Sequence, residues 1–175
     1  MKISSKLFLL LLPLFSVAQV PKGYWQQEVD YTINISLDTK DHRFTGTEVL
    51  HYINHSPDTL REVFFHLYFN AFQPNSMMDV RSLNIPDPDK RVGERISKLK
   101  GDEIGIQKVK RLQLNGQETL LTENGTVLKA VFPQAILPGD TAHFEMDFEG
   151  QVPIQIRRSG RDNEEGVDYT MTQWS

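Results

Sequence analysis

Two histidines with the spacing of a zinc site occur in the segment His51-Tyr52-Ile53-Asn54-His55. On a helix, histidines four positions apart share one face, and they hold zinc in metallopeptidases where a glutamate follows the first histidine as the general base. Tyr52 occupies that position here, and the sequence offers no evident third ligand. The segment also has the pattern of a strand that runs into a turn. We therefore predict that His51 and His55 are structural or surface residues.

The remaining side chains give no complete catalytic site either. His42, His66 and His143 are isolated in the sequence, and His66 is predicted to be a hydrogen-bonded residue at the edge of the core. The sequence contains no His-Glu dipeptide, no Gly-x-Ser-x-Gly elbow and no glycine-rich phosphate loop. We therefore predict no catalytic residue, no metal ligand and no cofactor in this chain.

Two clusters of charged side chains each allow two interpretations. Glu145, Asp147 and Glu149 share one face of a predicted strand, where they could hold calcium, but an exposed strand face is the preferred interpretation. The arginines between Arg157 and Arg161 could bind an anion, although a solvated loop is the preferred interpretation. Neither cluster therefore changes the prediction of a chain without its own metal site.

The composition argues against several other classes of protein. The 175 residues include no cysteine, which excludes disulfides, thiol catalysis and thiolate metal sites. The net charge of −4 argues against a nucleic-acid partner, because phosphate binding requires a basic surface.

The N-terminus has the features of a secretory signal peptide. Lys2 and Lys6 precede an apolar run over residues 7–15. Small side chains at Ser16 and Ala18 then precede a cleavage point between Ala18 and Gln19. The run is shorter than the roughly 20 residues of a membrane-spanning helix. We predict that residues 1–18 are a signal peptide. The mature protein is then exported, without a membrane span, to the periplasm, the cell surface or the medium.

Most of the predicted elements are strands. Apolar residues alternate with polar ones over 29–37 and 142–148, which is the period of a strand with one buried face. A strand is also predicted over 44–54, where Gly46 marks a bulge or a close backbone approach. Residues 60–69 are apolar on both faces, which predicts a central strand covered on both sides.

Turn residues separate the shorter strands. Asn115-Gly116 is typical of a tight hairpin between residues 109–114 and 117–121, and further strands are predicted over 126–132 and 167–174. Residues 73–105 break the pattern, with a short possible helix over 95–100, and a loop of this length is usually functional or docked. The predicted fold class is all-β, an antiparallel sandwich or saddle-shaped sheet pair with one long irregular loop.

Several of these segments resemble the N-terminal domain of the aminopeptidase N-like zinc metallopeptidases, the gluzincin family that includes leukotriene hydrolase. The resemblance spans almost all of residues 19–175. The matching segments are the run from Tyr24 to Asn54, Gly46-x-Glu48-x-x-x-Tyr52-x-Asn54-x-Ser56-Pro57-Asp58-x-Leu60 and Phe65-His66-Leu67-Tyr68-x-Asn70-Ala71-Phe72. Leu114-Asn115-Gly116, Leu137-Pro138-Gly139-Asp140 and Phe148-Glu149-Gly150-x-Val152-Pro153 follow in the order of that domain.

The resemblance implies a non-catalytic role for this chain. Residues 19–155 would form a β-saddle that packs on the parent's own C-terminal catalytic domain and helps to shape the peptide channel, and residues 156–175 would lead into that domain. The His-Glu-x-x-His zinc motif and the Gly-x-Met-Glu-Asn exopeptidase motif would belong to the catalytic domain, and this chain has neither. Zinc would be the cofactor of the parent, whose reaction is the release of N-terminal amino acids from peptides.

One local match implies a substrate contact. Thr172-Gln173-Trp174 resembles the segment that enters the catalytic domain, so Gln173 would line the site for the free amine of the substrate. Ser175 stands at the second position of that site, where family members often have Glu or Gln. The strand-like end at residues 167–174 leads us to expect a chain truncated before its catalytic domain. The alternative is a free-standing secreted β-sandwich that binds carbohydrate or a surface protein.

Overall fold

The structure of the chain is a computed structural model that describes residues 23–86, 89 and 92–172. The predicted cleavage point between Ala18 and Gln19 lies outside these residues, as do Gln173 and Ser175. Within the described ranges, no helix is both long and apolar enough to cross a membrane.

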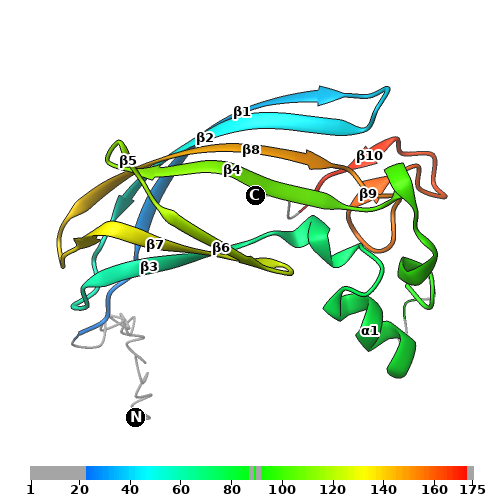
Figure 1. The fold of residues 1–175 in the computed structure, drawn as a ribbon, viewed down its shortest axis with the longest axis horizontal. Coiled ribbons are helices and arrows are strands. Elements are labelled where there is room, and N and C mark those ends of the chain that lie inside the picture. Colours follow the sequence, from blue (N-terminus) through cyan, green and yellow to red (C-terminus); the bar gives the residue numbers. More distant parts are fainter. Residues whose placement is uncertain (1–22, 87–88, 90–91, 173–175) are drawn as a thin grey trace, which may run out of the picture.

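Antiparallel strands make up most of the fold, which confirms the predicted all-β class (Figure 1). The larger sheet has the order β1 (Glu28–Asp38), β2 (Arg43–Ile53), β8 (Thr141–Gln151), β4 (Ile106–Leu114), β5 (Gln117–Glu118). The smaller sheet has the order β3 (Leu60–His66), β7 (Val127–Ile136), β6 (Leu120–Asn124), and β9 (Gly160–Arg161) pairs with β10 (Tyr169–Thr170). One α-helix, α1 (Met77–Asn84), and the 3-10 helices Tyr68–Ala71, Ile96–Lys98 and Gly101–Glu103 lie between β3 and β4.

The core lies between the two sheets and follows the predicted alternation. On β8, the side chains of Ala142, Phe144, Met146 and Phe148 are at most 7 % exposed, as predicted for the buried face of this strand. The alternation on β1 is only partly realised. Tyr31 remains 57 % exposed, because β1 forms the edge of the larger sheet and its inner face is not fully covered.

Two phenylalanine and glycine pairs lock β2 to β8. Phe44 lies opposite Gly150 and Gly46 lies opposite Phe148 in the strand register. Each ring covers the facing glycine so closely that an added Cβ would overlap the ring. The two rings also meet edge to face, with centroids 6.2 Å apart. The predicted close approach at Gly46 is confirmed, and the register shows no bulge there.

The hairpin at Asn115-Gly116 is confirmed, but the strand that follows it was predicted wrongly. Both turn residues have positive φ angles of 50° and 77°, which suits this dipeptide. The predicted strand over 117–121 is divided between the two sheets at Thr119. The backbone N–H and the hydroxyl of Thr119 both donate to the carbonyl of Leu112, at 3.0 and 2.9 Å, and this holds the crossing point.

The prediction of a central, doubly covered strand over 60–69 was wrong. The strand β3 ends at His66 and lies at the edge of the smaller sheet. Phe64 points away from the core and is 55 % exposed, while Phe69 is fully buried in the 3-10 helix that follows. The segment is apolar on both alternating faces for two reasons. One aromatic side chain is exposed to solvent, and the strand gives way to a 3-10 helix before the segment ends.

The irregular segment contains a helix that the sequence analysis missed. Ser76 caps α1 by accepting a hydrogen bond from the Asp79 N–H at 3.1 Å. The hydrophobic residues of α1 do not form a buried stripe, since Met77, Val80 and Leu83 are all more than half exposed. The expectation of a short helix near residues 95–100 agrees with the 3-10 helix Ile96–Lys98, whose Ile96 is fully buried.

Candidate functional site

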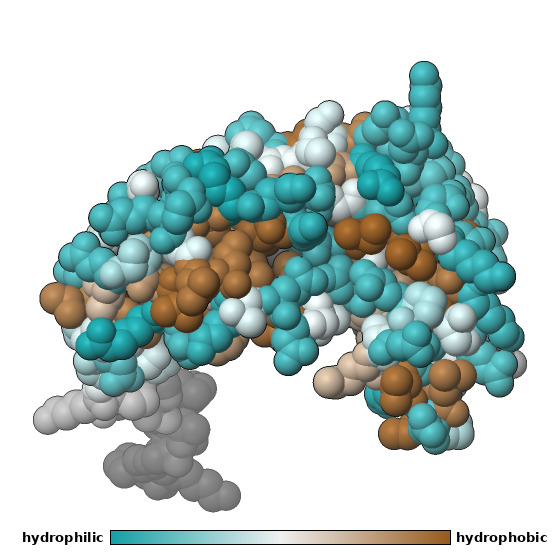
Figure 2. All heavy atoms as spheres, viewed as in Figure 1, coloured by the Kyte–Doolittle hydropathy of each residue, from teal (hydrophilic) through white to brown (hydrophobic). Residues whose placement is uncertain are grey.

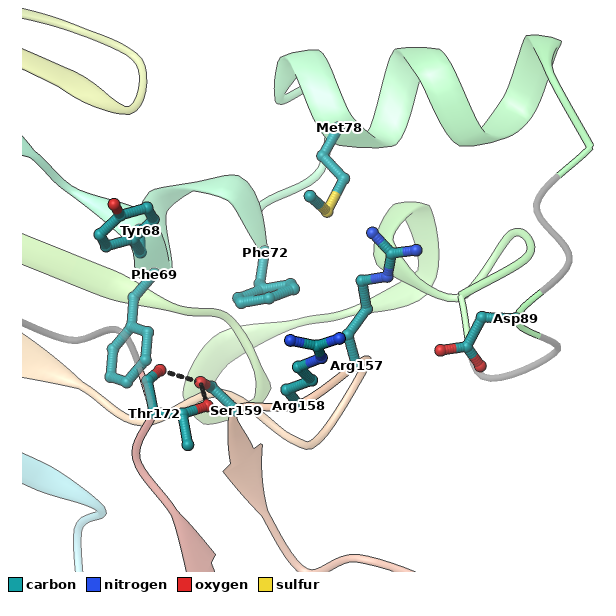
Figure 3. A pocket seen from close by; sticks show the side chains of 9 residues that line it. All are labelled: Tyr68, Phe69, Phe72, Met78, Asp89, Arg157, Arg158, Ser159 and Thr172. Carbon is teal, nitrogen blue, oxygen red and sulfur yellow. Dashed lines mark hydrogen bonds between the residues drawn. The ribbon is translucent and has the colours of Figure 1, made fainter. Parts of the chain in front are cut away.

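A polar cavity of about 400 Å³ lies beside the C-terminal end of the described chain (Figure 3). One wall comes from the segment between β3 and α1, and the other comes from the segment around β9 and β10. Its lining residues are Tyr68, Phe69, Phe72, Met78, Asp89, Arg157, Arg158, Ser159 and Thr172. We call it the C-terminal cavity.

The first wall of the C-terminal cavity is fixed to both sheets. Phe69 is fully buried, and its ring meets the ring of Phe44 edge to face at 5.9 Å. Asn70 accepts a hydrogen bond from the Gln107 N–H on β4 at 2.7 Å and donates one to the carbonyl of Gly125 at 3.2 Å. This wall therefore has little freedom to move apart from the core.

The second wall requires glycine at position 160. Gly160 has a φ angle of 142°, and a Cβ there would lie 2.6 Å from the backbone nitrogen of Gln155. Ser159 next to it donates its hydroxyl to the carbonyl of Thr172, and the two hydroxyl oxygens lie 2.9 Å apart. The chain therefore leaves the described part of the molecule from a position fixed against this wall.

The C-terminal cavity presents two guanidinium groups. Figure 3 shows those of Arg157 and Arg158 between Phe72 and Asp89. Arg158 is exposed and Arg157 is half-buried. Paired guanidinium groups suit a carboxylate or phosphate, which is the anion-binding alternative for this cluster.

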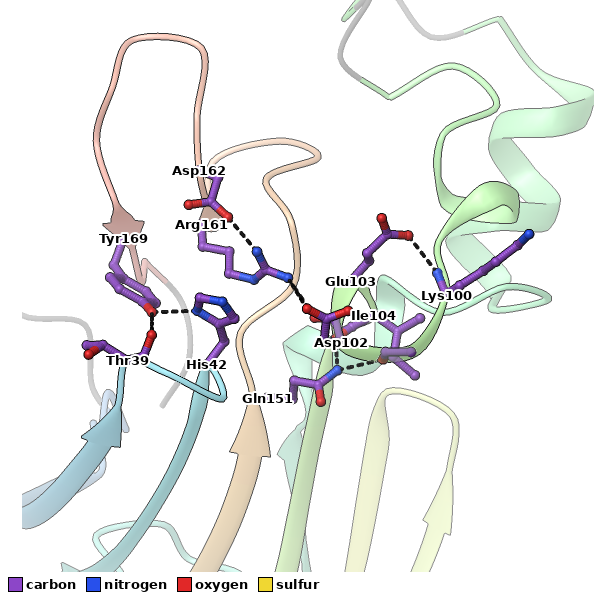
Figure 4. Close-up of polar contacts among 11 residues, drawn as sticks. Thr39, His42, Lys100, Asp102, Glu103, Ile104, Gln151, Arg161, Asp162 and Tyr169 are labelled. Carbon is purple, nitrogen blue, oxygen red and sulfur yellow. Dashed lines mark hydrogen bonds and ion pairs between the residues drawn. The ribbon is translucent and has the colours of Figure 1, made fainter.

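A solvated loop over residues 157–161 was the preferred prediction, and it was wrong for the second half of the segment. Arg161 is 5 % exposed as a residue, and its guanidinium donates to the carbonyl and the carboxylate of Asp102 at 3.0 and 3.1 Å (Figure 4). It also donates to the carboxylate of Asp162. A run of arginines next to acids is typical of surface loops, and only the packing shows that one of them is buried.

We expect Arg161→Met to lower the free energy of unfolding by about 1–2 kcal/mol, because buried charge-assisted hydrogen bonds would be lost. The cost stays below that of a fully buried ion pair, since Asp102 and Asp162 are 69 % and 57 % exposed and can regain water. Urea unfolding measures the effect, with Arg158→Met as the matched control at an exposed position. Equal stability of the two variants would contradict the structural role of Arg161.

A second anchor ties the β9–β10 hairpin to the turn between β1 and β2. The Tyr169 hydroxyl lies 2.6 Å from His42 Nδ1 and donates to the carbonyl of Thr39 at 3.4 Å (Figure 4). Burial is the main cause that raises the pKa of Tyr169, so the phenol stays protonated and available as a donor at neutral pH. Together with Arg161, this contact orients the segment that ends at Thr172.

The predicted histidine roles hold for most positions. His51 and His143 face each other on the outer side of the sheet with their Nδ1 atoms 3.4 Å apart, and His55 pairs with Glu28 at 3.2 Å. His66 is exposed and stacks on Tyr68 at 5.3 Å, so its prediction as a hydrogen-bonded core-edge residue was wrong. In the part of the chain that the structure describes, no three His, Cys, Asp or Glu residues are placed to hold a metal ion.

The preferred interpretation of the carboxylates on β8 is confirmed. Each is about 40 % exposed and faces a basic side chain: Glu145 with His143, Asp147 with Arg111, and Glu149 with Lys110. The hydrogen bond from Arg111 is the main cause that lowers the pKa of Asp147. Each carboxylate on this face therefore has a basic side chain as its partner.

Gln173 lies outside the described residues, so its contact with a substrate amine stays a prediction. Its neighbour Thr172 lines the C-terminal cavity, and this places the predicted substrate-binding residue next in sequence to the cavity wall. No sequence pattern indicated that Tyr68, Phe72 or Met78 belongs to a site. Their only signal was the position of two of them, Tyr68 and Phe72, in the segment that resembles the metallopeptidase domain.

No protein-family model matches the sequence, and no curated protein matches it. Solved structures of M1 zinc metallopeptidases share its fold. A two-domain M1 zinc metallopeptidase mutant bound to L-arginine is 16 % identical, with 86 % of this chain and 27 % of that chain covered and a TM-score of 0.50. A mutant of the M1 zinc metallopeptidase from Deinococcus radiodurans is 16 % identical over 84 % of this chain and 26 % of that chain, with a TM-score of 0.49. The chain thus spans about a quarter of the length of the structures that it resembles.

Proposed function

We propose that this chain is the non-catalytic N-terminal domain of an exported zinc aminopeptidase, which packs on a catalytic domain and helps to shape its peptide channel. The observation that carries the proposal is the likeness in fold to an M1 zinc metallopeptidase over 86 % of this chain and 27 % of the other. Zinc and the hydrolytic reaction would belong to the catalytic domain, and this chain would contribute shape and the contact of Gln173 with the substrate amine.

The exposed side of α1 supports a docking role. Met77, Val80 and Leu83 are 87 %, 52 % and 51 % exposed, and Ile85 just after the helix is 52 % exposed. Figure 2 shows this apolar surface gathered over α1, on the same side of the molecule as the first wall of the C-terminal cavity. A contiguous apolar surface of this kind favours contact with another protein surface. The catalytic domain would cover it in the parent protein.

The first test is the coding sequence after codon 175. We expect an in-frame His-Glu-x-x-His motif with a downstream glutamate, as metal-assisted peptide hydrolysis requires. A reading frame that closes without such a motif would favour a free-standing binding module instead.

The second test is an activity assay on purified residues 19–175. We expect no hydrolysis of amino-acid anilides with or without added zinc, because the described residues hold no cluster of three metal-binding side chains. An unrelated zinc aminopeptidase in the same buffer is the positive control. Zinc-dependent cleavage by this chain alone would contradict the non-catalytic assignment.

A further inference from the structure

A second cavity, of about 190 Å³, opens between the two sheets. Its floor is the inner face of the larger sheet, and its rim comes from β3 and from the edge strand β1. Its lining residues are Tyr31, Glu48, Leu50, Phe64, Phe65, His66, Leu67, Tyr68, Gln107, Val109, Met146 and Phe148. We call it the intersheet pocket.

Glu48 is the one carboxylate in this lining. It lies on β2 among the inward-facing residues, opposite Met146 on β8 and Ile33 on β1. Among the described residues it has neither a hydrogen bond nor an ion pair. Burial alone raises its pKa, and burial together with the Glu48 charge raises the pKa of Tyr31. Glu48 is partly exposed, so its carboxylate is reached from the opening of the pocket and offers a negative charge beside apolar side chains.

Aromatic side chains surround the entrance of the intersheet pocket. Tyr31, Phe64 and Tyr68 are 57 %, 55 % and 38 % exposed, which is unusual for three large rings around one opening. The Lys129 ammonium already lies 5.8 Å from the centroid of the Phe64 ring, so one of these rings attracts a cation within the molecule itself. Lys129 also pairs with Glu62 at 2.7 Å, so the carboxylate of Glu62 reduces the repulsion between Lys129 and a second cation nearby.

We propose that the intersheet pocket binds a small organic cation, a protonated amine on a single ring or a short apolar body, with the ammonium paired to Glu48 and in contact with the rings of Tyr31 and Tyr68. This assignment does not depend on the proposed function, although Tyr68 lines both this pocket and the C-terminal cavity.

The size and charge of the pocket favour this occupant over others. A cavity of about 150 Å³ accommodates benzene in a protein core, so about 190 Å³ fits one ring with a short side chain and is small for a larger ligand. An anion would face the Glu48 carboxylate at close range. The titratable groups that face Glu48 across the pocket are Tyr31, His66 and Tyr68, and no lysine or arginine lines the pocket to neutralise it.

The test is isothermal titration of phenethylammonium into the protein at pH 7.5, with 2-phenylethanol as the neutral probe of equal size. We expect the amine to bind with a dissociation constant on the order of 1 mM and the alcohol to bind about 10-fold more weakly, since a desolvated ammonium near a carboxylate and aromatic rings gains both interactions. Glu48→Gln should reduce the affinity for the amine about 10-fold and leave that for the alcohol unchanged.

Asp30→Asn is the matched control, because it removes one negative charge at an exposed position of β1 outside the pocket. Thermal melting of each variant confirms folding before titration, and Tyr31→Leu tests the aromatic rim independently, with an expected loss of severalfold. Equal affinity of the wild type and Glu48→Gln for the amine would overturn the proposal, as would the absence of binding at 20-fold above the expected constant. Tighter binding of N-acetyl-lysine amide than of phenethylammonium would also overturn it, because the preferred ligand would then be a lysine side chain of a protein.

Discussion

Gly150→Ala is expected to lower the free energy of unfolding by about 3 kcal/mol, the upper range for overpacking a core. A methyl group at this position would overlap the Phe44 ring and lie 2.5 Å from the carbonyl oxygen of Ile106 on the neighbouring strand. Phe44 is 1 % exposed and is held between the rings of Phe69 and Phe148, so it cannot turn aside. Denaturant unfolding followed by circular dichroism measures the loss.

Gly116→Ala separates lack of space from backbone strain. Gly116 has a positive φ angle of 77° and no atom within 4 Å of an added Cβ, so that variant meets strain alone. It should cost about 1–2 kcal/mol. Gly150 shows no such positive φ angle, so its substitution meets lack of space alone. A cost at Gly150 no larger than that at Gly116 would show that the Phe44 ring yields, and the proposed locking of β2 to β8 would then be incorrect.

Asn54→Ala is expected to destabilise the fold by a similar amount, about 3 kcal/mol, because buried groups would lose their partners. The Asn54 side chain is fully buried. Its amide nitrogen donates to the carbonyls of Asp58, Ile136 and Leu137 at 2.8, 3.3 and 3.2 Å. Its oxygen accepts from the Ser56 hydroxyl at 2.7 Å. The oxygen also accepts from the Ser56 N–H and the Gln27 amide at 3.1 and 3.2 Å, so six contacts depend on one amide, and urea unfolding measures their combined loss.

Asn54→Asp refines this prediction through pH. The variant replaces an NH₂ donor by a carboxylate oxygen that faces three carbonyl oxygens, which disfavours ionisation and raises the pKa of the new carboxyl group in the folded state. A carboxyl group with a raised folded pKa loses stability as pH rises, so this variant should be less stable at pH 8 than at pH 5. Asn34→Ala on the exposed face of β1 is the control, with a change within about 0.5 kcal/mol. A pH-independent Asn54→Asp variant would argue against these amide contacts.

Alternation of apolar and polar residues correctly predicted the strands that have one face in the core and the other in solvent. The strand β8 alternates between core and charged or histidine side chains over residues 142–149, so its sequence pattern and its structure coincide there. The pattern wrongly predicted a doubly covered strand at β3. Phe64 is exposed within the strand, whereas Leu67 is buried just after the strand ends. The helix α1 was missed because its apolar residues face outward rather than forming a buried stripe.

The candidate sites were less predictable than the fold. Arg161 and Glu48 are charged residues in segments that look solvated or strand-like in sequence, and only three-dimensional packing shows that the first is buried and the second has no partner. The rings of Tyr31, Phe64 and Tyr68 come from separate segments, and no spacing in the sequence indicates that they surround one opening. Local patterns carry information about faces of one element, whereas a pocket depends on contacts between distant elements.

The burial of Asn54 also has a consequence for producing the protein. Asn54-His55-Ser56 matches the acceptor sequence for asparagine-linked glycans, and attachment takes place on the growing chain in cells that have this pathway. A sugar on an amide with no exposed surface would prevent β2 from meeting the turn before β8. A eukaryotic secretory host would then retain or degrade the chain, whereas a bacterial host without this modification avoids the conflict.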